Sequence, residues 1–140
     1  IAAMIIATGA KSMGKDVTLF FTFWGLNVLR KAKKVRVKKT FIERMFASMM
    51  PRGTKKLPIS NMNMLGMGPK MIRSIMKKKN VDSLEVLLAN AQKMGVKLVA
   101  CAMSMDIMGI KETELLDGIE YAGVASYLAD SDEANHHLFI

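Results

Sequence analysis

The sequence is poor in the residues that form most metal sites and disulfides. Among its 140 residues it has one cysteine, Cys101, and two histidines, His136 and His137. A single cysteine cannot form an intramolecular disulfide, and so few ligands give no zinc-finger or zinc-ribbon spacing. We therefore expect a chain that folds without disulfides, metal or other cofactors, which is typical of a reducing compartment such as the cytoplasm.

Long apolar runs and nucleotide-binding motifs are missing as well. The sequence has no stretch of 18 or more apolar residues, so we expect no transmembrane helix. It contains no glycine-rich dinucleotide fingerprint, no P-loop and no Ser-His-Asp arrangement, which leaves NAD and ATP chemistry without support. The 51% of hydrophobic residues excludes intrinsic disorder, and the length suits a single domain.

Charge is distributed unevenly along the chain, whose net charge is +9. Residues 30–80 contain sixteen lysines and arginines against Glu43 alone, whereas residues 81–140 contain three lysines against ten carboxylates. Eight of the fourteen methionines also fall in residues 30–80. This pattern predicts a basic, Met-rich insertion at about residues 30–80 within one domain that spans residues 1–140.

The flanks of this insertion repeat the order of a helix followed by a buried strand. Residues 1–13 are apolar and rich in alanine, and a β-branched and aromatic run follows at 17–24. A second helix at 82–94 and a second strand at 96–102 repeat this order. Strands that are apolar on both faces belong in a parallel sheet, so we predict an α/β fold with helices on both faces of that sheet.

Weaker patterns occur in the rest of the chain. The apolar stripe from Phe41 to Met49 predicts a helix, and its position outside the sheet unit predicts a contact between subunits in a homo-oligomer. The other expected elements are a loop at 60–69, a helix around 71–76, a strand at 119–122, a helix at 125–135 and a short strand at 137–140.

Cys101 is the main candidate for chemistry, because it lies at the carboxyl end of a predicted parallel strand, where ligands bind in open sheets. A helix after it would bring backbone amides near the sulfur and favour the nucleophilic thiolate. A buried structural thiol remains open as the alternative. The nearby Met103, Met105 and Met108 are more typical of core or contact residues than of a copper site. The two histidines are interpreted as exposed or capping residues and not as a general base.

The basic insertion indicates an acidic partner. Its aromatic residues Phe41 and Phe46 fall on the apolar face of a predicted helix, which favours packing over base stacking, so no nucleic acid partner is expected. An acidic protein or an anionic membrane surface fits better, and a solvated basic face without a partner remains the alternative. The candidate partner-binding residues are Lys33, Lys34, Lys38 and Lys39.

Three segments of the chain together resemble a known family. They are FFTFWGL at residues 20–26, MPRG at residues 50–53 and ACAMSMDIMGI at residues 100–110. The chain resembles the DsrE/DsrF-like family over essentially its whole length, in particular the Met-rich branch that is often labelled peroxiredoxin-like. The segment that contains Cys101 is the most specific of the three.

The resemblance implies a mainly parallel five-stranded sheet flanked by helices on both faces, in a protein that is commonly oligomeric. Family members begin with a strand before the first helix, so we expect that strand to be missing from this chain. The better understood relatives carry sulfur as a cysteine persulfide, in relays with TusA-like and rhodanese-like proteins. Cys101 matches the cysteine position of this branch. Peroxidase activity is not expected, because no resolving cysteine exists and the preceding strand has no Pro or Thr to hold a peroxide.

We therefore interpret the protein as a cytoplasmic sulfur-relay protein that accepts and passes sulfane sulfur on Cys101; whether it acts as a sulfurtransferase enzyme stays open. The alternative is a non-enzymatic interaction module that docks on an acidic protein or, as a peripheral membrane protein, on an anionic membrane. The residues expected to form the pocket around Cys101 are Phe23, Trp24, Gly25, Asn27, Met103, Ser104, Met105 and Asp106.

Overall fold

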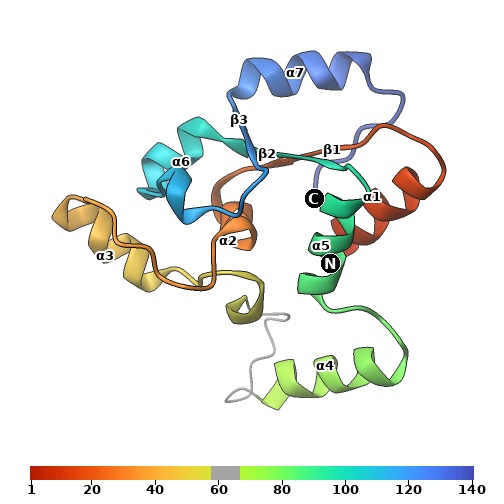
Figure 1. Cartoon of the computed structure of the whole chain (residues 1–140), viewed down its shortest axis with the longest axis horizontal. Coiled ribbons are helices and arrows are strands. Elements are labelled where there is room, and N and C mark those ends of the chain that lie inside the picture. Colours follow the sequence, from red (N-terminus) through yellow and green to blue (C-terminus); the bar gives the residue numbers. More distant parts are fainter. Residues whose placement is uncertain (58–66) are drawn as a thin grey trace.

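The centre of the fold is a parallel sheet with the strand order β1-β2-β3. The computed structural model describes residues 1–57 and 67–140, and within these residues the strands are β1 (Thr18–Phe21), β2 (Lys97–Cys101) and β3 (Glu120–Ala122) (Figure 1). β2 is the central strand and pairs with β1 on one side and β3 on the other. Because all three strands run in the same direction, their carboxyl ends meet at one edge of the sheet.

Helices lie on both faces of this sheet. α1 (Ala2–Ser12), α2 (Leu26–Leu29) and α5 (Leu84–Lys93) cover one face, and α7 (Val124–Glu133) lies on the other (Figure 1). α6 (Ala102–Met108) follows β2 directly. Two further helices, α3 (Phe41–Met49) and α4 (Met67–Lys78), extend away from the sheet in the basic part of the chain. Short 3-10 turns complete the fold at η1 (Phe23–Gly25), η2 (Thr54–Lys56) and η4 (Glu112–Glu114).

Local sequence signals explain where the two repeated helix-strand units begin and end. Gly14 and Gly95 follow α1 and α5 with positive φ angles of 76° and 78°, a conformation that glycine adopts without a steric penalty. α5 begins after Ser83, whose hydroxyl accepts a hydrogen bond from the backbone N–H of Val86. The predicted helices and strands of both flanks are therefore confirmed within one to three residues.

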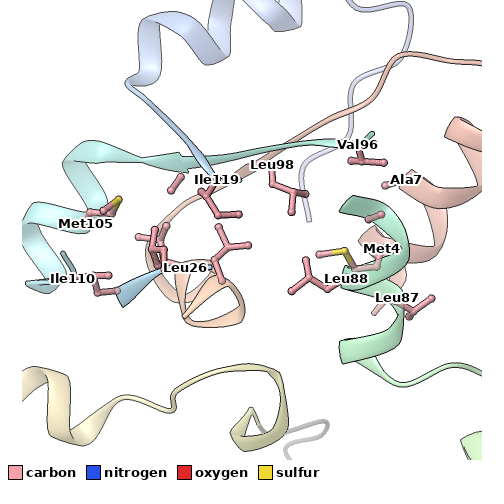
Figure 2. Packing of buried hydrophobic residues seen from close by; sticks show 14 residues of the cluster. Met4, Ala7, Leu26, Leu87, Leu88, Val96, Leu98, Met105, Ile110 and Ile119 are labelled. Carbon is pink, nitrogen blue, oxygen red and sulfur yellow. The ribbon is translucent and has the colours of Figure 1, made fainter. Parts of the chain in front are cut away.

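The core lies between the sheet and the helices α1, α2 and α5. Leu98 and Ala100 of β2 face this side, and Figure 2 shows Leu98 among the side chains of α1, α2 and α5. Burial of such apolar side chains contributes roughly 1.5–3 kcal/mol each for the larger ones. The main members of the cluster are Met4, Ala7, Leu26, Leu29, Leu87, Leu88, Ala91, Leu98, Met105, Ile110, Leu115 and Ile119.

The structure confirms an α/β fold with a parallel sheet and corrects several details. The described residues form three strands and not five, because only three apolar segments pair with one another. The strand expected at 137–140 is wrong: these residues are exposed and have no strand partner. Of the loop expected at 60–69, residues 60–66 lie outside the described part, and Met67–Pro69 instead begin α4.

The helices at 41–49 and 124–133 agree with the patterns seen in the sequence. Across residues 1–57 and 67–140, none of the helices combines the length and the apolar character that crossing a membrane requires.

Candidate functional site

Cys101 is the last residue of β2 and the residue from which α6 begins. It pairs with Ala122 of β3 at the carboxyl end of the sheet, as the sequence predicted. Since side chains alternate along a strand, Cys101 shares a face with Val99, opposite the face that Leu98 and Ala100 bury in the main core. Its side chain is only 1% exposed, so the sulfur lies beneath the protein surface.

The residues after β1 approach Cys101 from the neighbouring strand. η1 (Phe23–Gly25) follows β1 at the same edge of the sheet and contacts α6. Phe23 and Trp24 are about half exposed, and Phe23 has a φ of 38°, which is rare for a residue other than glycine. Strained backbone of this kind is concentrated at functional sites. The structure thus brings this turn, predicted to border the site, next to the helix that begins at Cys101.

Helix α6 supplies the other predicted pocket residues. Met103 and Asp106 are exposed, whereas Ser104 and Met105 are buried. Ser104 lies three residues after Cys101, and its hydroxyl has no hydrogen-bond partner among the residues described. A buried hydroxyl without a partner is uncommon in proteins, because leaving it unpaired costs about 1–3 kcal/mol. Ser104 therefore offers a free donor and acceptor in the first turn after the thiol.

An open hollow of about 460 Å³ lies beside the start of α6. It is lined by Ala102, Met105, Asp106, Ile110 and Tyr121, among others, and so reaches the residue adjacent to Cys101. A second hollow of about 410 Å³ shares Tyr121 with the first. Burial raises the pKa of Tyr121, and the carboxylate of Glu112 adds to this effect, so its hydroxyl stays protonated at neutral pH.

A cluster of buried charges lies beyond this site and was not foreseen from the sequence. Glu114 is fully buried, and its carboxylate forms ion pairs with Arg52 at 2.7 Å, Lys39 at 2.5 Å and Arg30 at 3.5 Å. The backbone N–H of Lys111 donates to the same carboxylate at 3.1 Å. Burial alone raises the pKa of Glu114, but these hydrogen bonds outweigh it and lower the pKa to about 2. Glu114 is therefore ionised and holds three cations together.

The buried charge cluster is connected to the turn beside Cys101 by a chain of hydrogen bonds. Arg30 donates from Nη1 to the side-chain oxygen of Asn27 at 3.2 Å, and Asn27 donates from Nδ2 to the carbonyl of Trp24 at 3.2 Å. The backbone N–H of Gly53 donates to the carbonyl of Asn27 at 3.1 Å. Asn27 was predicted as a pocket residue, and the structure shows that it is fully buried and that it fixes the turn containing Trp24.

Two residues of the MPRG segment, Arg52 and Gly53, make contacts that only their residue types allow. Gly53 has a φ of 72°, and a Cβ atom there would lie 3.1 Å from the carbonyl oxygen of Arg30. Glycine permits both the backbone conformation and the close approach. Arg52 then reaches Glu114. A motif noticed only for its family resemblance thus packs the basic part of the chain against the domain.

The four candidate partner-binding lysines differ in their surroundings. Lys33, Lys34 and Lys38 are exposed and free to meet a partner. The side chain of Lys39 is only 7% exposed, and besides pairing with Glu114 it donates to the carbonyl of Gly109 at 2.6 Å. Lys39 therefore ties the basic segment to the end of α6.

A second polar contact attaches α3 to the end of α6. Thr40 and Glu43 form a capping box at the start of α3, and Glu43 also pairs with Lys111 at 3.1 Å. The hydrogen bond from the backbone N–H of Thr40, followed by that from Lys111, lowers the pKa of Glu43 to about 2. Gly109 ends α6 with a φ of 62°, and a Cβ atom there would meet Glu43 at 2.7–2.8 Å. The end of α6 thus accepts the first turn of α3 at close range.

The histidines are exposed, as their sequence interpretation proposed. His137 forms a hydrogen bond with the hydroxyl of Tyr127 on α7, and Tyr127 in turn packs against Phe20 with ring centroids 5.2 Å apart. These contacts position the chain after α7 on the second face of the sheet. In the described part of the chain no group of three or more His, Cys, Asp or Glu side chains is arranged to hold a metal ion.

Comparison with known proteins gives a consistent match over the chain. The family model described as the DsrE/DsrF/DrsH-like family matches residues 1–139. The chain is 58% identical to the uncharacterized protein YrkE of Bacillus subtilis over 139 residues, which cover 99% of this chain and 87% of that protein. It is 35% identical to the sulfur carrier protein DsrE2 of Allochromatium vinosum over 140 residues, which cover 97% of this chain and 86% of that protein.

Proposed function

Because the chain belongs to the DsrE/DsrF/DrsH-like family, we propose that it is a sulfur-relay protein in which Cys101 accepts sulfane sulfur and passes it on as a persulfide. The observation that carries the proposal is the position of Cys101, at the carboxyl end of the central strand of a parallel sheet and beside an open hollow. It is the one cysteine of the chain, so each protein molecule would carry sulfur at a single position.

The chemistry consists of two thiol exchange steps. The Cys101 thiolate attacks the outer sulfur of a donor persulfide, a sulfur–sulfur bond of the donor breaks, and the donor leaves as a thiolate. The acceptor's thiolate then attacks the outer sulfur held on Cys101, and Cys101 leaves as a thiolate. Each step exchanges one sulfur–sulfur bond for another, so neither an added oxidant nor a reductant is needed.

The surroundings of Cys101 have distinct roles in this proposal. Ser104, which lacks a partner among the described residues, would hydrogen-bond the added sulfur, and Met105 would give the site an apolar wall. Phe23, Trp24 and Gly25 border the site from the neighbouring strand end, and Asn27 holds that turn. Since Cys101 is buried, transfer requires that the turn or the start of α6 move to admit the donor.

The proposed donors and acceptors are TusA-like and rhodanese-like relay proteins, and the exposed Lys33, Lys34 and Lys38 would attract an acidic face of such a partner. Binding through these lysines should weaken as salt rises, because exposed charges are screened over about 10 Å at 0.1 M ionic strength. The same lysines support the second candidate, a non-enzymatic interaction module that docks on an acidic partner without carrying sulfur.

Intact mass spectrometry separates the two candidates. The protein is incubated with thiosulfate, polysulfide or glutathione persulfide, and its mass is compared with that of Cys101→Ser treated in the same way. A relay protein gains the mass of one sulfur atom in the wild type alone. An unchanged mass with all three donors supports the interaction module.

A further inference from the structure

The turn η1 is one of two elements whose movement could admit a donor to the buried Cys101, and it is firmly held. Asn27 donates to the carbonyl of Trp24, and Arg30 of the buried charge cluster donates to Asn27. The side chains of Asn27 and Arg30 are both fully buried. Movement of η1 would break this link and leave buried polar groups without partners, which is unfavourable.

The other element is α6, which begins directly after Cys101 and is held less firmly. The hydroxyl of Ser104 has no hydrogen-bond partner among the residues described, so movement of the helix breaks no hydrogen bond of this side chain. The open hollow of about 460 Å³ lies along α6 and leaves space beside it, with Ala102, Met105 and Ile110 among its lining residues. Of the two elements, α6 is therefore the one that can move more easily.

Two contacts fasten the carboxyl end of α6 to the segment in which α3 begins. Lys39 donates from Nζ to the carbonyl of Gly109 at 2.6 Å, and Lys111 pairs with Glu43 at 3.1 Å. Lys39 also pairs with Glu114, which anchors the end of α6 in the buried charge cluster. The segments meet closely, because a Cβ atom at Gly109 would lie 2.7–2.8 Å from Glu43. We call these two contacts the α6 clasp.

We propose that α6 is a lid over Cys101 and that the α6 clasp keeps this lid closed. Release of the clasp frees the carboxyl end of α6, and the helix then turns about its start at Cys101 and uncovers the sulfur. The inference rests on the proposed sulfur transfer and adds to it the movement that admits the donor and the acceptor.

The position of the clasp in the chain connects it to the binding of a partner. Lys33, Lys34 and Lys38, the proposed contacts of an acidic relay partner, precede Lys39 in the same segment. The helix that follows, α3, contacts α6 and has no buried residue. A partner that binds this segment would therefore act on the clasp, so that the lid opens when the partner is bound. A lid that is closed at other times would protect the bound sulfur from other thiols.

Alkylation of Cys101 in the native protein tests the clasp. The rate of reaction with iodoacetamide is followed by intact mass for the wild type, Glu43→Gln, Lys111→Met and the double variant, without urea and at urea concentrations below the unfolding transition. Lys11→Met and Asp16→Asn are the matched controls. They break an ion pair that is also 3.1 Å long but lies where β1 begins, at the opposite edge of the sheet.

Each single clasp variant should be alkylated about two- to fivefold faster than the wild type, which is the effect expected for the loss of one partly exposed ion pair. The double variant should match the single variants, because either substitution alone breaks the pair. The rates should stay constant at low urea, since local opening exposes little surface. The control variants should react like the wild type.

Clasp variants that are alkylated at the wild-type rate would overturn the proposal, as would equal acceleration in the controls. A rate that rises with urea as steeply as global unfolding would also overturn it, because the sulfur would then be reached without a separate movement of α6. Loading with glutathione persulfide is measured in the same variants. Faster alkylation of the clasp variants beside a wild type that never gains sulfur would support the clasp and overturn the proposed function.

Discussion

The carboxylate of Glu114 and the guanidinium of Arg52 lie 2.7 Å apart although 62 positions separate them in the sequence. With Arg30 and Lys39 they form a buried charge cluster that joins the basic part of the chain to the C-terminal half of the domain. Hydrogen bonds continue from Arg30 through Asn27 to the turn beside Cys101. The cluster is therefore linked, through Arg30 and Asn27, to the turn that contains Trp24 and helps to hold that turn in place.

Glu114→Gln should destabilise the protein strongly. The substitution leaves three cations buried without their common counterion, and breaking a buried ion pair in this way costs about 3–5 kcal/mol. The free energy of unfolding in urea measures the loss. Glu112→Gln is the matched control, because Glu112 is exposed two residues away and should change stability by no more than about 0.5 kcal/mol. Equal effects of the two substitutions on the free energy of unfolding would show that the buried charge cluster does not stabilise the protein.

Stability should fall as the pH is lowered from about 4.5 towards 2. The pKa of Glu114 is lowered from 4.5 to about 2 in the folded protein, so its contribution is complete above the unfolded value and is lost as protons bind the folded carboxylate. The pKa of Glu43 is lowered to about 2 as well, so it acts in the same direction. Urea unfolding at a series of pH values measures this slope, which should be shallower in Glu114→Gln. A variant with an unchanged slope would contradict the assignment to Glu114.

Gly109→Ala should separate α3 from the end of α6. A Cβ atom at this position meets Glu43 at 2.7–2.8 Å, and the φ of 62° is unfavourable for alanine, so a loss of about 1–3 kcal/mol is expected. Gly9→Ala is the control: it lies within α1 and has nothing within 4 Å of the added atom, so it should be neutral or stabilising by up to about 1 kcal/mol. Thermal unfolding of both variants provides the comparison. If Gly109→Ala and Gly9→Ala unfold at the same temperature, the close contact between Gly109 and Glu43 does not contribute to stability.

Alkylation of Cys101 should be slow in the native protein and still occur without denaturant. The sulfur is 1% exposed, so iodoacetamide reaches it only when the surrounding turn or α6 opens locally. The rate of labelling is compared with that of the unfolded chain in urea. Reaction that occurs only after global unfolding would make Cys101 a packing residue and would remove the basis for sulfur transfer.

The elements of the fold were predictable wherever the information is local. The order of helix, glycine and strand at residues 1–24 and 82–102 follows from apolar periodicity and from glycines that accept positive φ. The prediction of a strand at 137–140 failed because apolar residues alone suggested it, and they do not show which strand it would pair with. Pairing partners depend on the whole fold, so short apolar runs at an end of the chain are ambiguous.

The site was predictable in part. The turn at Phe23–Gly25 contacts α6, the helix that follows Cys101, because parallel strands bring their carboxyl ends together. The position of Cys101 in the sequence left two alternatives open, a reactive thiolate and a buried structural thiol, and its burial could not be predicted from that position alone. The buried charge cluster was missed because Lys39 and Arg52 look like members of a solvated basic run. Their common partner Glu114 lies in the acidic half of the chain, and no local pattern marks it.

The most direct test of sulfur transfer on Cys101 follows one sulfur atom from donor to acceptor. The protein is loaded with glutathione persulfide, freed of donor, and mixed with an acceptor thiol protein, and the intact masses of both proteins are recorded with time. The proposal predicts that the wild type gains one sulfur atom and returns to its original mass as the acceptor gains one. Cys101→Ser should neither load nor transfer. Transfer by Cys101→Ser, or a wild type that never gains sulfur, would contradict it.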